Sequence, residues 1–472
     1  MASSGLVPQT GNPSPLDRLL RVFGDVRAEE GGRALLMFLN IFLLLVAYYI
    51  IKTVREPLIL RAGGTGVSGA ELKTYAAAVQ ALTLIVYVPL YGWVASRLPR
   101  LKLIVAVVLF FVACIELFSL AGRARLPYVG FVFYVWVGIF SLTMIAQFWS
   151  YANDIYRRPD GERLFPLIAI GSTAGAPIGA FVAGRLFAAR LSPYLMMQIA
   201  AGLLLFHLAL YLLVARRPAP TGSAPVPAGE PLAGRGGFSL VLRSRYLLLF
   251  AGMVVLLNTV NTTGEYILDT YLQTKAAQVV AQAVVEQPSL SADAQEALAR
   301  SFIGQFKADY FLGFNVLAVL LQAFAVSRLI KAAGIAGAVL ALPLVALGSY
   351  GFAALGAGLV VIRWAKTAEN ATDYSFMNTG RQMLWLSTSR EEKYKAKQAI
   401  DTFFHRGGDM LTAGVVWAGT HGLGLDATGF ARVNLLLVAA WIGLALLLLR
   451  ENRRLSEPAS TAAAPEGAAA PA

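Results

Sequence analysis

The sequence of 472 residues contains little charge and almost no cysteine. Only 14% of its residues are Asp, Glu, Lys or Arg, and Cys114 is its one cysteine. Ordinary soluble domains carry about 25% charged residues, so this composition excludes them. A single cysteine excludes a disulfide framework and a thiolate metal site within one chain. The first 34 residues lack an apolar run followed by a small-residue cleavage site, and we therefore expect no signal peptide.

The common catalytic motifs are absent as well. The sequence contains no P-loop, no HExxH and no nucleophile elbow. The stretch from Gly64 to Gly69 matches a dinucleotide-binding pattern, but it lies in a short segment between apolar runs with no preceding strand. We therefore expect that the protein is not an enzyme and that it uses no cofactor and no metal.

Long apolar runs dominate the chain. Hydrophobic residues make up 57% of it, and its mean hydropathy is +0.62. Uncharged runs of about 20 residues span a bilayer as helices, and their continuity excludes the alternating pattern of outer-membrane barrels. The sequence predicts an all-α polytopic protein with twelve spans, near 35–57, 75–95, 102–121, 128–153, 164–186, 194–215, 246–271, 307–328, 334–354, 356–377, 398–420 and 430–450.

The net charge of +13 would favour nucleic-acid binding in a soluble chain. Here the Lys and Arg residues lie mostly in short loops between the apolar runs, and the loops on the side of both termini carry more of them. This bias predicts that both termini are cytoplasmic. We expect a multi-pass protein of the bacterial inner membrane, with lipid as its surroundings and no nucleic acid as a partner.

The middle of the chain divides the spans into two sets of six. Residues 217–245 are rich in Pro, Gly and Ala and predict a cytoplasmic linker. It separates an N-terminal half, 35–216, from a C-terminal half, 246–454, with a cytoplasmic segment before them (1–34) and a disordered tail after them (455–472). The motif Ser-Arg-Leu recurs at Ser96 and Ser327, and polar residues 275–306 lengthen the loop after span seven. This is a major-facilitator-like plan, with the substrate site between the halves.

Charged residues within the first span mark a candidate site. Lys52 and Arg55 lie on one helical face, and Glu56 follows Lys52 by four residues. Long basic side chains at a helix end can reach the membrane surface, which is one reading of the cluster. Glu56 neutralises only one of the two cations, however, so we favour a cavity-facing site.

The seventh span carries a polar stripe. Asn258, Thr262, Glu265 and Asp269 recur on one face over three turns. Hydrogen bonding between packed helices is the structural alternative, but two carboxylates on one stripe favour a functional role. Spans ten and eleven repeat the pattern with Arg363, Lys366, Asn370 and Asp373, and with Asp401, His405 and Asp409. In these two spans, pairing among the charged residues themselves is an equally strong reading.

These residues also occur in sequence patches that resemble the ATP/ADP translocase family of plastids and obligate intracellular bacteria. The patches include Ile51-Lys-Thr-Val-Arg-Glu-Pro-Leu58, Phe148-Trp-Ser-Tyr-Ala-Asn-Asp-Ile155, Glu162-Arg-Leu-Phe-Pro-Leu167, Leu242-Arg-Ser-Arg-Tyr246, and Asp373-Tyr-Ser375 with Lys395-Ala-Lys-Gln-Ala-Ile-Asp401. Members of this family exchange ATP for ADP or carry other nucleotides, sometimes with protons.

The resemblance implies roles for particular residues. Arg55 stands where the family has a functional lysine, Glu265 matches its acidic residue on span seven, and Lys395 with Lys397 match its basic pair before span eleven. Two positions depart from the family: the lysine is Arg55 here, and no residue near Tyr134 corresponds to the family's glutamate early in span four.

The sequence therefore predicts a transporter that exchanges nucleotides at a central charged cavity. Two other functions remain open: a proton-coupled major-facilitator symporter of another organic anion, and a non-transporting membrane scaffold or sensor. The expected substrate-binding residues are Lys52, Arg55, Glu265, Asn258, Asn261, Arg363, Lys366 and Lys397. The expected gating or coupling residues are Glu56, Asp154, Asp269, Asp373 and Asp401.

Overall fold

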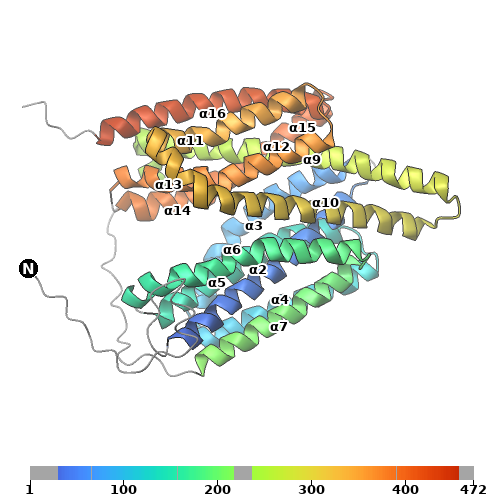
Figure 1. The fold of residues 1–472 in the computed structure, drawn as a ribbon, viewed down its shortest axis with the longest axis horizontal. Coiled ribbons are helices and arrows are strands. Elements are labelled where there is room, and N and C mark those ends of the chain that lie inside the picture. Colours follow the sequence, from blue (N-terminus) through green and yellow to red (C-terminus); the bar gives the residue numbers. More distant parts are fainter. Residues whose placement is uncertain (1–29, 65, 157, 217–236, 390, 457–472) are drawn as a thin grey trace, which may run out of the picture.

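The computed structural model describes residues 30–64, 66–156, 158–216, 237–389 and 391–456, and these residues are nearly all helical (Figure 1). The N-terminal helices are α2 (Gly31–Leu60), α3 (Gly69–Ala95), α4 (Arg100–Arg123), α5 (Val129–Ile155), α6 (Arg158–Ala188) and α7 (Pro193–Ala215). After α8 (Gly237–Arg243), the C-terminal helices are α9 (Arg245–Glu286), α10 (Ala292–Leu320), α11 (Val326–Ala354), α12 (Leu359–Thr372), α13 (Asn378–Leu384), α14 (Lys397–Ala399), α15 (His405–Trp417) and α16 (Ala427–Ser456).

The C-terminal helices contain several π-helical turns. These are η1 (Leu321–Ala325), η2 (Asp373–Met377), η4 (Glu392–Ala396), η5 (Ile400–Phe404) and η6 (Ala418–Gly422), with a short 3-10 turn, η3, at Trp385–Ser387. A π-turn widens the helix locally, and such turns are frequent at functional sites. Two of them, η2 and η5, carry Asp373 and Asp401.

The helices form two bundles side by side (Figure 1). In the N-terminal bundle, α2 packs against α6 and α7; in the C-terminal bundle, α9 packs against α15 and α16. The bundles meet where α10 packs on α2 and α6, and where α3 packs on α9 and α15. We call the end at which α2 begins and α16 ends the terminal face, and the end from which α9 and α10 extend the hairpin face (Figure 1).

The packing of α2 against α6 is encoded by glycines that recur every four residues. A Cβ added to Gly171 would lie 2.6 Å from the Phe38 carbonyl oxygen, and one added to Gly175 would lie 2.7 Å from that of Phe42. Gly179 approaches Val46 in the same way. Small residues at this spacing let helix backbones approach closely in a membrane, where van der Waals packing drives association. These glycines therefore hold α2, and the charged residues on it, in position.

The segment after the seventh predicted span is helical. α9 continues to Glu286 and α10 begins at Ala292, after a Ser291 cap that accepts a hydrogen bond from Ala294 N. The polar stretch 275–306, predicted as a lengthened loop, forms instead a helical hairpin that projects from the bundle (Figure 1). Its Ala, Gln and Glu content favours helix, whereas the prediction treated polarity as the sign of a loop.

The apolar runs predicted as spans lie within helices. Among the described residues, nine helical stretches are long and apolar enough to cross a membrane. The stretch from Ala292 to Ala354 covers two predicted spans and contains a non-helical break at Gly334 (φ 62°). Predicted spans 356–377 and 398–420 are helical but more highly charged, and they are not among the nine. The count of twelve therefore stays a prediction.

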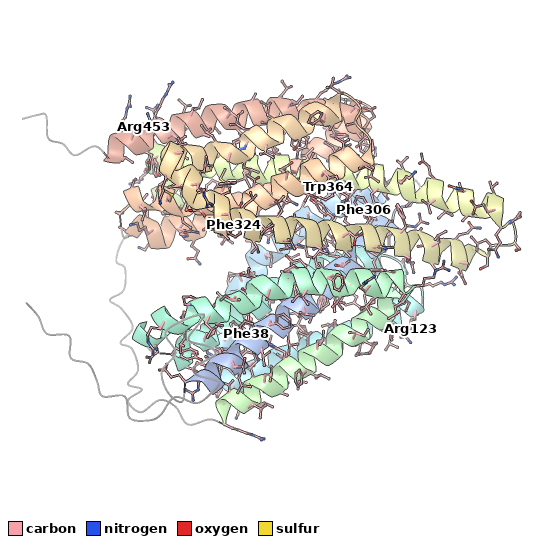
Figure 2. All side chains as sticks on the ribbon, in the orientation of Figure 1. Phe38, Arg123, Phe306, Phe324, Trp364 and Arg453 are labelled. Atoms are coloured by element: carbon pink, nitrogen blue, oxygen red, sulfur yellow. The ribbon has the colours of Figure 1, made fainter. Side chains whose placement is uncertain are left out.

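The surface of the bundle matches a lipid environment. Phe324 and Trp364 are both 60% exposed on the sides of the helices, whereas Arg123 and Arg453 lie near opposite ends of the molecule (Figure 2). Apolar side chains around the middle and charged ones at both ends are the pattern of an integral membrane protein. The predicted multi-pass membrane protein is confirmed.

Candidate functional site: a charged cavity between the bundles

A cavity of about 200 Å³ lies between the two bundles. Side chains from α2, α3, α5, α9, α10, α12, η2 and α15 line it, including Lys52, Arg55, Lys73, Glu265 and Asp409. Small-molecule sites measure roughly 300–1,000 Å³, so in this conformation the cavity is smaller than a whole organic ligand requires. It is large enough for a phosphate-sized group.

Five charged side chains at one side of this cavity form a network that we call the charge cluster. Its members are Glu56 on α2, Lys73 on α3, Glu265 and Asp269 on α9, and Lys307 on α10. Lys73 Nζ lies 2.6 Å from Glu56 Oε2 and 2.7 Å from Asp269 Oδ2. Lys307 Nζ lies 2.5 Å from Asp269 Oδ1 and 3.3 Å from Glu265 Oε2. The cluster therefore joins both bundles through buried ion pairs.

The charges of this cluster are balanced once Arg55 is included. Arg55 Nη2 lies 2.8 Å from Glu56 Oε1, so three cations face the three carboxylates. The side chains of Glu56, Asp269 and Lys307 are at most 1% exposed. Buried charges are tolerated when they are paired and hydrogen-bonded, and removing one partner is strongly destabilising. The cluster is therefore stable only while its positive and negative charges balance.

Lys52 is the cation in this cavity that the surrounding carboxylates do not balance. Its Nζ lies 4.6 Å from the ring centre of Phe311 and 5.0 Å from that of Tyr49. Among the described residues, no ion pair joins Lys52 to a carboxylate, whereas Arg406 on α15 pairs with Asp409 at 3.3 Å. Cation–π contacts stabilise an ammonium group by only about 0.5–2 kcal/mol. An anion in the cavity would therefore be attracted to Lys52.

Arg55 also faces an aromatic ring. Its guanidinium carbon lies 4.1 Å above the centre of the Tyr134 ring on α5. Tyr134 lies in the segment where the resembled family has a glutamate. The structure thus places a neutral ring against Arg55, which leaves Glu56 as its one carboxylate partner among the described residues.

The polar stripe on α9 divides between two partners. Asn258 Nδ2 donates to Asp409 Oδ1 at 2.8 Å, and the Thr262 hydroxyl donates to the same oxygen at 3.1 Å. Glu265 and Asp269, further along α9, belong to the charge cluster. The stripe therefore faces α15 at one end and α3 and α10 at the other, as expected for a helix that borders the cavity.

The basic residues on α12 have different surroundings. Lys366 Nζ donates to Asn261 Oδ1 at 2.7 Å and to Glu369 Oε1 at 2.9 Å, which pairs its charge within the C-terminal bundle. Arg363 instead packs its guanidinium over the Phe306 and Trp364 rings. Lys366, Arg363 and the predicted Asn258 are not among the cavity-lining residues, whereas Asn261 is.

Four other predicted residues lie away from the cavity lining. Asp154 pairs with Arg100 at 2.5 Å on an exposed surface. Asp401 pairs with Arg381 at 2.5 Å, and Lys397 donates to Gln382 at 2.6 Å. Asp373, on η2, precedes the cavity-lining Tyr374 but does not line the cavity itself.

Sequence reasoning did not single out Lys307 or assign Lys73 a role within the membrane. Both lie at the edge of an apolar run, where the sequence alone does not distinguish a lysine within the membrane from one in the adjoining loop. Their signal is spacing: Lys307, Tyr310 and Phe314 share a face of α10, and the Tyr310 hydroxyl donates to Glu265 Oε1 at 2.5 Å. The partners on α9, by contrast, were predicted.

Further contacts join the two bundles to each other on the hairpin side of the cavity. Gln273 on α9 donates to the Leu60 carbonyl at 2.6 Å and accepts from Ala70 N at 3.0 Å. His421 Nε2 lies 2.6 Å from Glu71 Oε1, and Arg61 pairs with Glu296 at 2.5 Å. The charge cluster is thus the inner layer of a closure between the bundles.

Comparisons with known proteins bear on this arrangement. Residues 13–121 match a family model described as TLC ATP/ADP transporter, which confirms the resemblance over that stretch. No curated protein matches the chain. Among solved structures, the chain is similar to nucleoside transporter NupG, with a TM-score of 0.60 and 14% identity over 89% of this chain and 98% of that one.

Two further structures show the same similarity. A POT family transporter in complex with 5-aminolevulinic acid has a TM-score of 0.59 and 14% identity over 90% of this chain and 96% of that one. A bacterial homologue of iron transporter ferroportin in an inward-facing state has a TM-score of 0.59 and 12% identity over 89% and 98%. At such identities the similarity shows the fold alone, which is major-facilitator-like. With the family match, it supports a membrane transporter.

Proposed function

We propose that this chain exchanges nucleotides, ATP for ADP, across a membrane by alternating access to the central cavity. The observation that carries the proposal is Lys52, a cation that lines the cavity, contacts aromatic rings and has no ion-pair partner among the described residues. An entering phosphate would supply the missing negative charge. Arg55, on the same face of α2, would bind it bidentately.

The cavity also offers surfaces for the rest of a nucleotide. The rings of Phe314 and Tyr374 stack in parallel with centres 5.6 Å apart, and both line the cavity. Aromatic faces bind nucleobases by stacking. The Asn261 and Asn258 amides lie nearby on α9, where they would contact the base or ribose after rearrangement of their present hydrogen bonds.

The charge arrangement supports exchange rather than one-way release. An empty carrier would have to enclose Lys52 without a counterion, which is costly in a low-dielectric site. A loaded carrier encloses a compensated charge. Phosphate would also compete with Glu56 for Arg55, which would weaken the charge cluster and allow the bundles to separate. Movement would therefore be faster with a nucleotide bound in either direction.

The family match supports the substrate class, because the matched model describes ATP/ADP transporters and its range includes Lys52, Arg55, Glu56 and Lys73. In this proposal Glu265, Asp269 and Glu56 are gating residues, because they pair with cations that connect the bundles. Lys366 would assist through Asn261, to which it is hydrogen-bonded.

Counterflow in proteoliposomes tests the proposal. Liposomes preloaded with ADP should take up labelled ATP several-fold faster than empty ones, and Lys52→Met should abolish this stimulation. Lys331→Met, at an exposed lysine on α11, is the matched control and should behave as wild type. Absence of stimulation by internal ADP, GDP or other nucleotides would refute exchange.

A pH gradient distinguishes the main alternative in the same vesicles. A proton-coupled symporter would accumulate an organic anion under an inward proton gradient without any internal substrate. Exchange predicts that the gradient has no effect when the vesicles are empty. A scaffold would show no flux in either experiment.

A further inference from the structure

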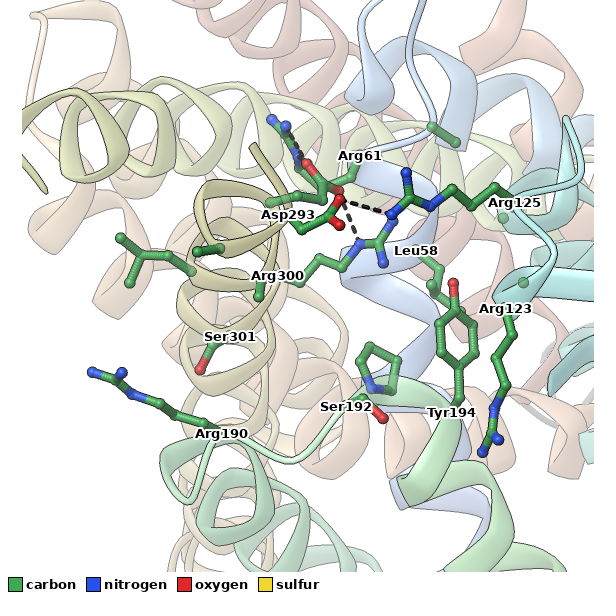
Figure 3. A pocket seen from close by; sticks show the side chains of 18 of the residues that line it. Leu58, Arg61, Arg123, Arg125, Arg190, Ser192, Tyr194, Asp293, Arg300 and Ser301 are labelled. Carbon is green, nitrogen blue, oxygen red and sulfur yellow. Dashed lines mark hydrogen bonds and ion pairs between the residues drawn. The ribbon is translucent and has the colours of Figure 1, made fainter. Parts of the chain in front are cut away.

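A second and larger cavity, of about 1,210 Å³, opens at the hairpin face. Its walls are the end of α2, the α4–α5 loop, the α6–α7 loop and the helical hairpin of α9 and α10 (Figure 3). We call it the vestibule. It shares no lining residue with the central cavity, so the two are separate sites.

The vestibule contains more cations than anions. Arg61, Arg123, Arg125, Arg190 and Arg300 line it, against three carboxylates, Glu286, Asp293 and Glu296. Arg125 pairs with Asp293 at 2.7 Å, and both side chains are more than three-quarters exposed. Such exposed pairs contribute only about 0–1 kcal/mol, so a ligand anion can replace these carboxylates at little cost.

Two arginines have no acidic partner in the part of the chain that the structure describes. Arg123 ends α4, and Arg190 follows α6; both side chains are exposed at the vestibule wall. Figure 3 shows them on opposite sides of the vestibule, with Ser192 and Tyr194 between them. The hydroxyls of Ser192 and Tyr194 are further hydrogen-bonding groups. The vestibule therefore combines free guanidinium groups with neutral donors.

The backbone at these arginines is unusual. Among the described residues, three that are not glycine have positive φ, and all three line the vestibule: Arg125 (54°), Tyr128 (61°) and Arg190 (58°). Side chains disfavour this left-handed region, which glycine adopts freely. Strained positions of this kind concentrate at functional sites.

The C-terminal bundle provides an internal comparison. α4 and α6 end in the same hydrogen-bonding pattern, with Leu126 N bonded to the Ala121 carbonyl and Leu191 N to that of Leu186. α11 ends in this pattern too, but there the left-handed position is Gly356 (φ 81°). Glycine is the usual residue at this position of a Schellman motif. In the N-terminal bundle the corresponding residues are Arg125 after α4 and Arg190 after α6, although a left-handed backbone is less favourable for arginine than for glycine.

The basic residues in the loops of the hairpin face are concentrated around the vestibule. At the hairpin face, the connections at 355–358 and 423–426 contain no Lys or Arg. The arginines of the α4–α5 and α6–α7 loops line the vestibule instead. Basic residues set by topology alone would have no reason to collect around one cavity.

We propose that the vestibule is a binding site for a phosphate-bearing anion, held by Arg190 and Arg123 with Arg125, whose exposed side chains would turn from opposite walls toward the ligand. Guanidinium groups bind phosphate oxygens in a bidentate geometry, and bound phosphate would take the place of Asp293 on Arg125. The site is distinct from the central cavity and does not depend on what that cavity transports.

Pyrophosphate binding to the full-length protein in phosphatidylcholine nanodiscs tests this site. The measurement uses a Lys52→Met background, so that the central cavity contributes less to binding. Arg190→Gly should weaken pyrophosphate binding about tenfold or more, since a charge-assisted contact is lost. Its melting temperature should stay equal or rise, because glycine suits the left-handed backbone. This combination separates a lost contact from a damaged fold.

Lys275→Gln is the matched control, since Lys275 is exposed on the same hairpin but does not line the vestibule. It should bind pyrophosphate as the background does. Unchanged affinity in Arg190→Gly, or an equal loss in Lys275→Gln, would overturn the proposal.

A second arm identifies the source of the phosphate. In nanodiscs containing phosphatidylglycerol, a lipid headgroup at the vestibule would compete with pyrophosphate, and Arg190→Gly would remove the competition. If phosphatidylglycerol has no effect on pyrophosphate binding, the ligand is a soluble phosphate compound. The counterflow experiment is independent of both arms, so failure of the vestibule site and failure of nucleotide exchange are distinguishable.

Discussion

The Nζ of Lys73 lies 2.7 Å from Asp269 Oδ2, although the two residues are on α3 and α9 and belong to different bundles. The same ammonium group is 2.6 Å from Glu56 Oε2. One lysine thus holds a carboxylate of its own bundle and one of the opposite bundle. Separation of the bundles on this side requires the second contact to break, so the Lys73–Asp269 pair is the structural basis of the proposed gate.

A double-mutant cycle on this pair should show strong coupling. Lys73→Met and Asp269→Asn each leave the charge cluster unbalanced, and loss of one buried partner costs about 3–5 kcal/mol. The double variant removes one charge of each sign and restores the balance. We therefore expect it to unfold at a higher temperature than either single variant, with a coupling energy of about 1–3 kcal/mol. Thermal unfolding of the four proteins in one detergent measures this, and additive losses would contradict it.

Lys52→Met should stabilise the protein and prevent nucleotide binding. The substitution keeps the length of the side chain and its packing on Phe311 but removes a cation that no carboxylate balances. We expect a higher melting temperature without ligand and loss of the further rise that ATP produces in the wild type. Lys52→Arg should keep that rise in part. A lower melting temperature for Lys52→Met would mean that its charge is balanced in another way.

The sequence predicted the positions of the helices better than their connections. Continuous apolar runs identify membrane helices because each must bury its own backbone hydrogen bonds in lipid. The polarity of segment 275–306 predicts a loop, but its helix-forming residues need no apolar face when they project beyond the bundle. The glycines at 171, 175 and 179 carried a packing signal that hydrophobicity alone does not reveal.

The sequence predicted the carboxylates of the charge cluster but not the lysines that pair with them. Glu56, Glu265 and Asp269 stand out because carboxylates within apolar runs are costly. Lys73 and Lys307, their partners, lie at the ends of apolar runs, where lysine is common for reasons of topology. Which of these groups meet depends on helix packing between residues almost 200 positions apart, such as Lys73 and Asp269. The periodicity of a single helix cannot supply that information.

Gly175→Ala should destabilise the N-terminal bundle. Its new Cβ would lie 2.7 Å from the Phe42 carbonyl oxygen, and the two helices would have to separate. Overpacking of this kind costs about 1–3 kcal/mol. Gly202→Ala on α7 is the control, because nothing lies within 4 Å of its Cβ position and alanine is about 1 kcal/mol more favourable in a helix. Melting temperatures should therefore move in opposite directions, and a parallel shift would argue against close packing of α2 on α6.

Asp426 should confer a pH-dependent contribution to stability at the start of α16. Its carboxylate accepts hydrogen bonds from Gly429 N at 2.8 Å and from the Thr428 hydroxyl at 2.8 Å. These donors, Gly429 N–H first, hold the pKa of Asp426 below its usual range. A lowered folded pKa means that the stabilisation is present above the unfolded value of about 4 and is lost as the pH falls through the folded value.

Asp426→Ala should cost about 1 kcal/mol at neutral pH, and this loss should shrink below pH 4. Asp426→Asn retains a capping oxygen without the charge, so its stability should depend less on pH in this range. Thermal unfolding between pH 3 and pH 7 compares the three proteins, and a constant difference between Asp426→Ala and wild type over that range would rule out a charged cap.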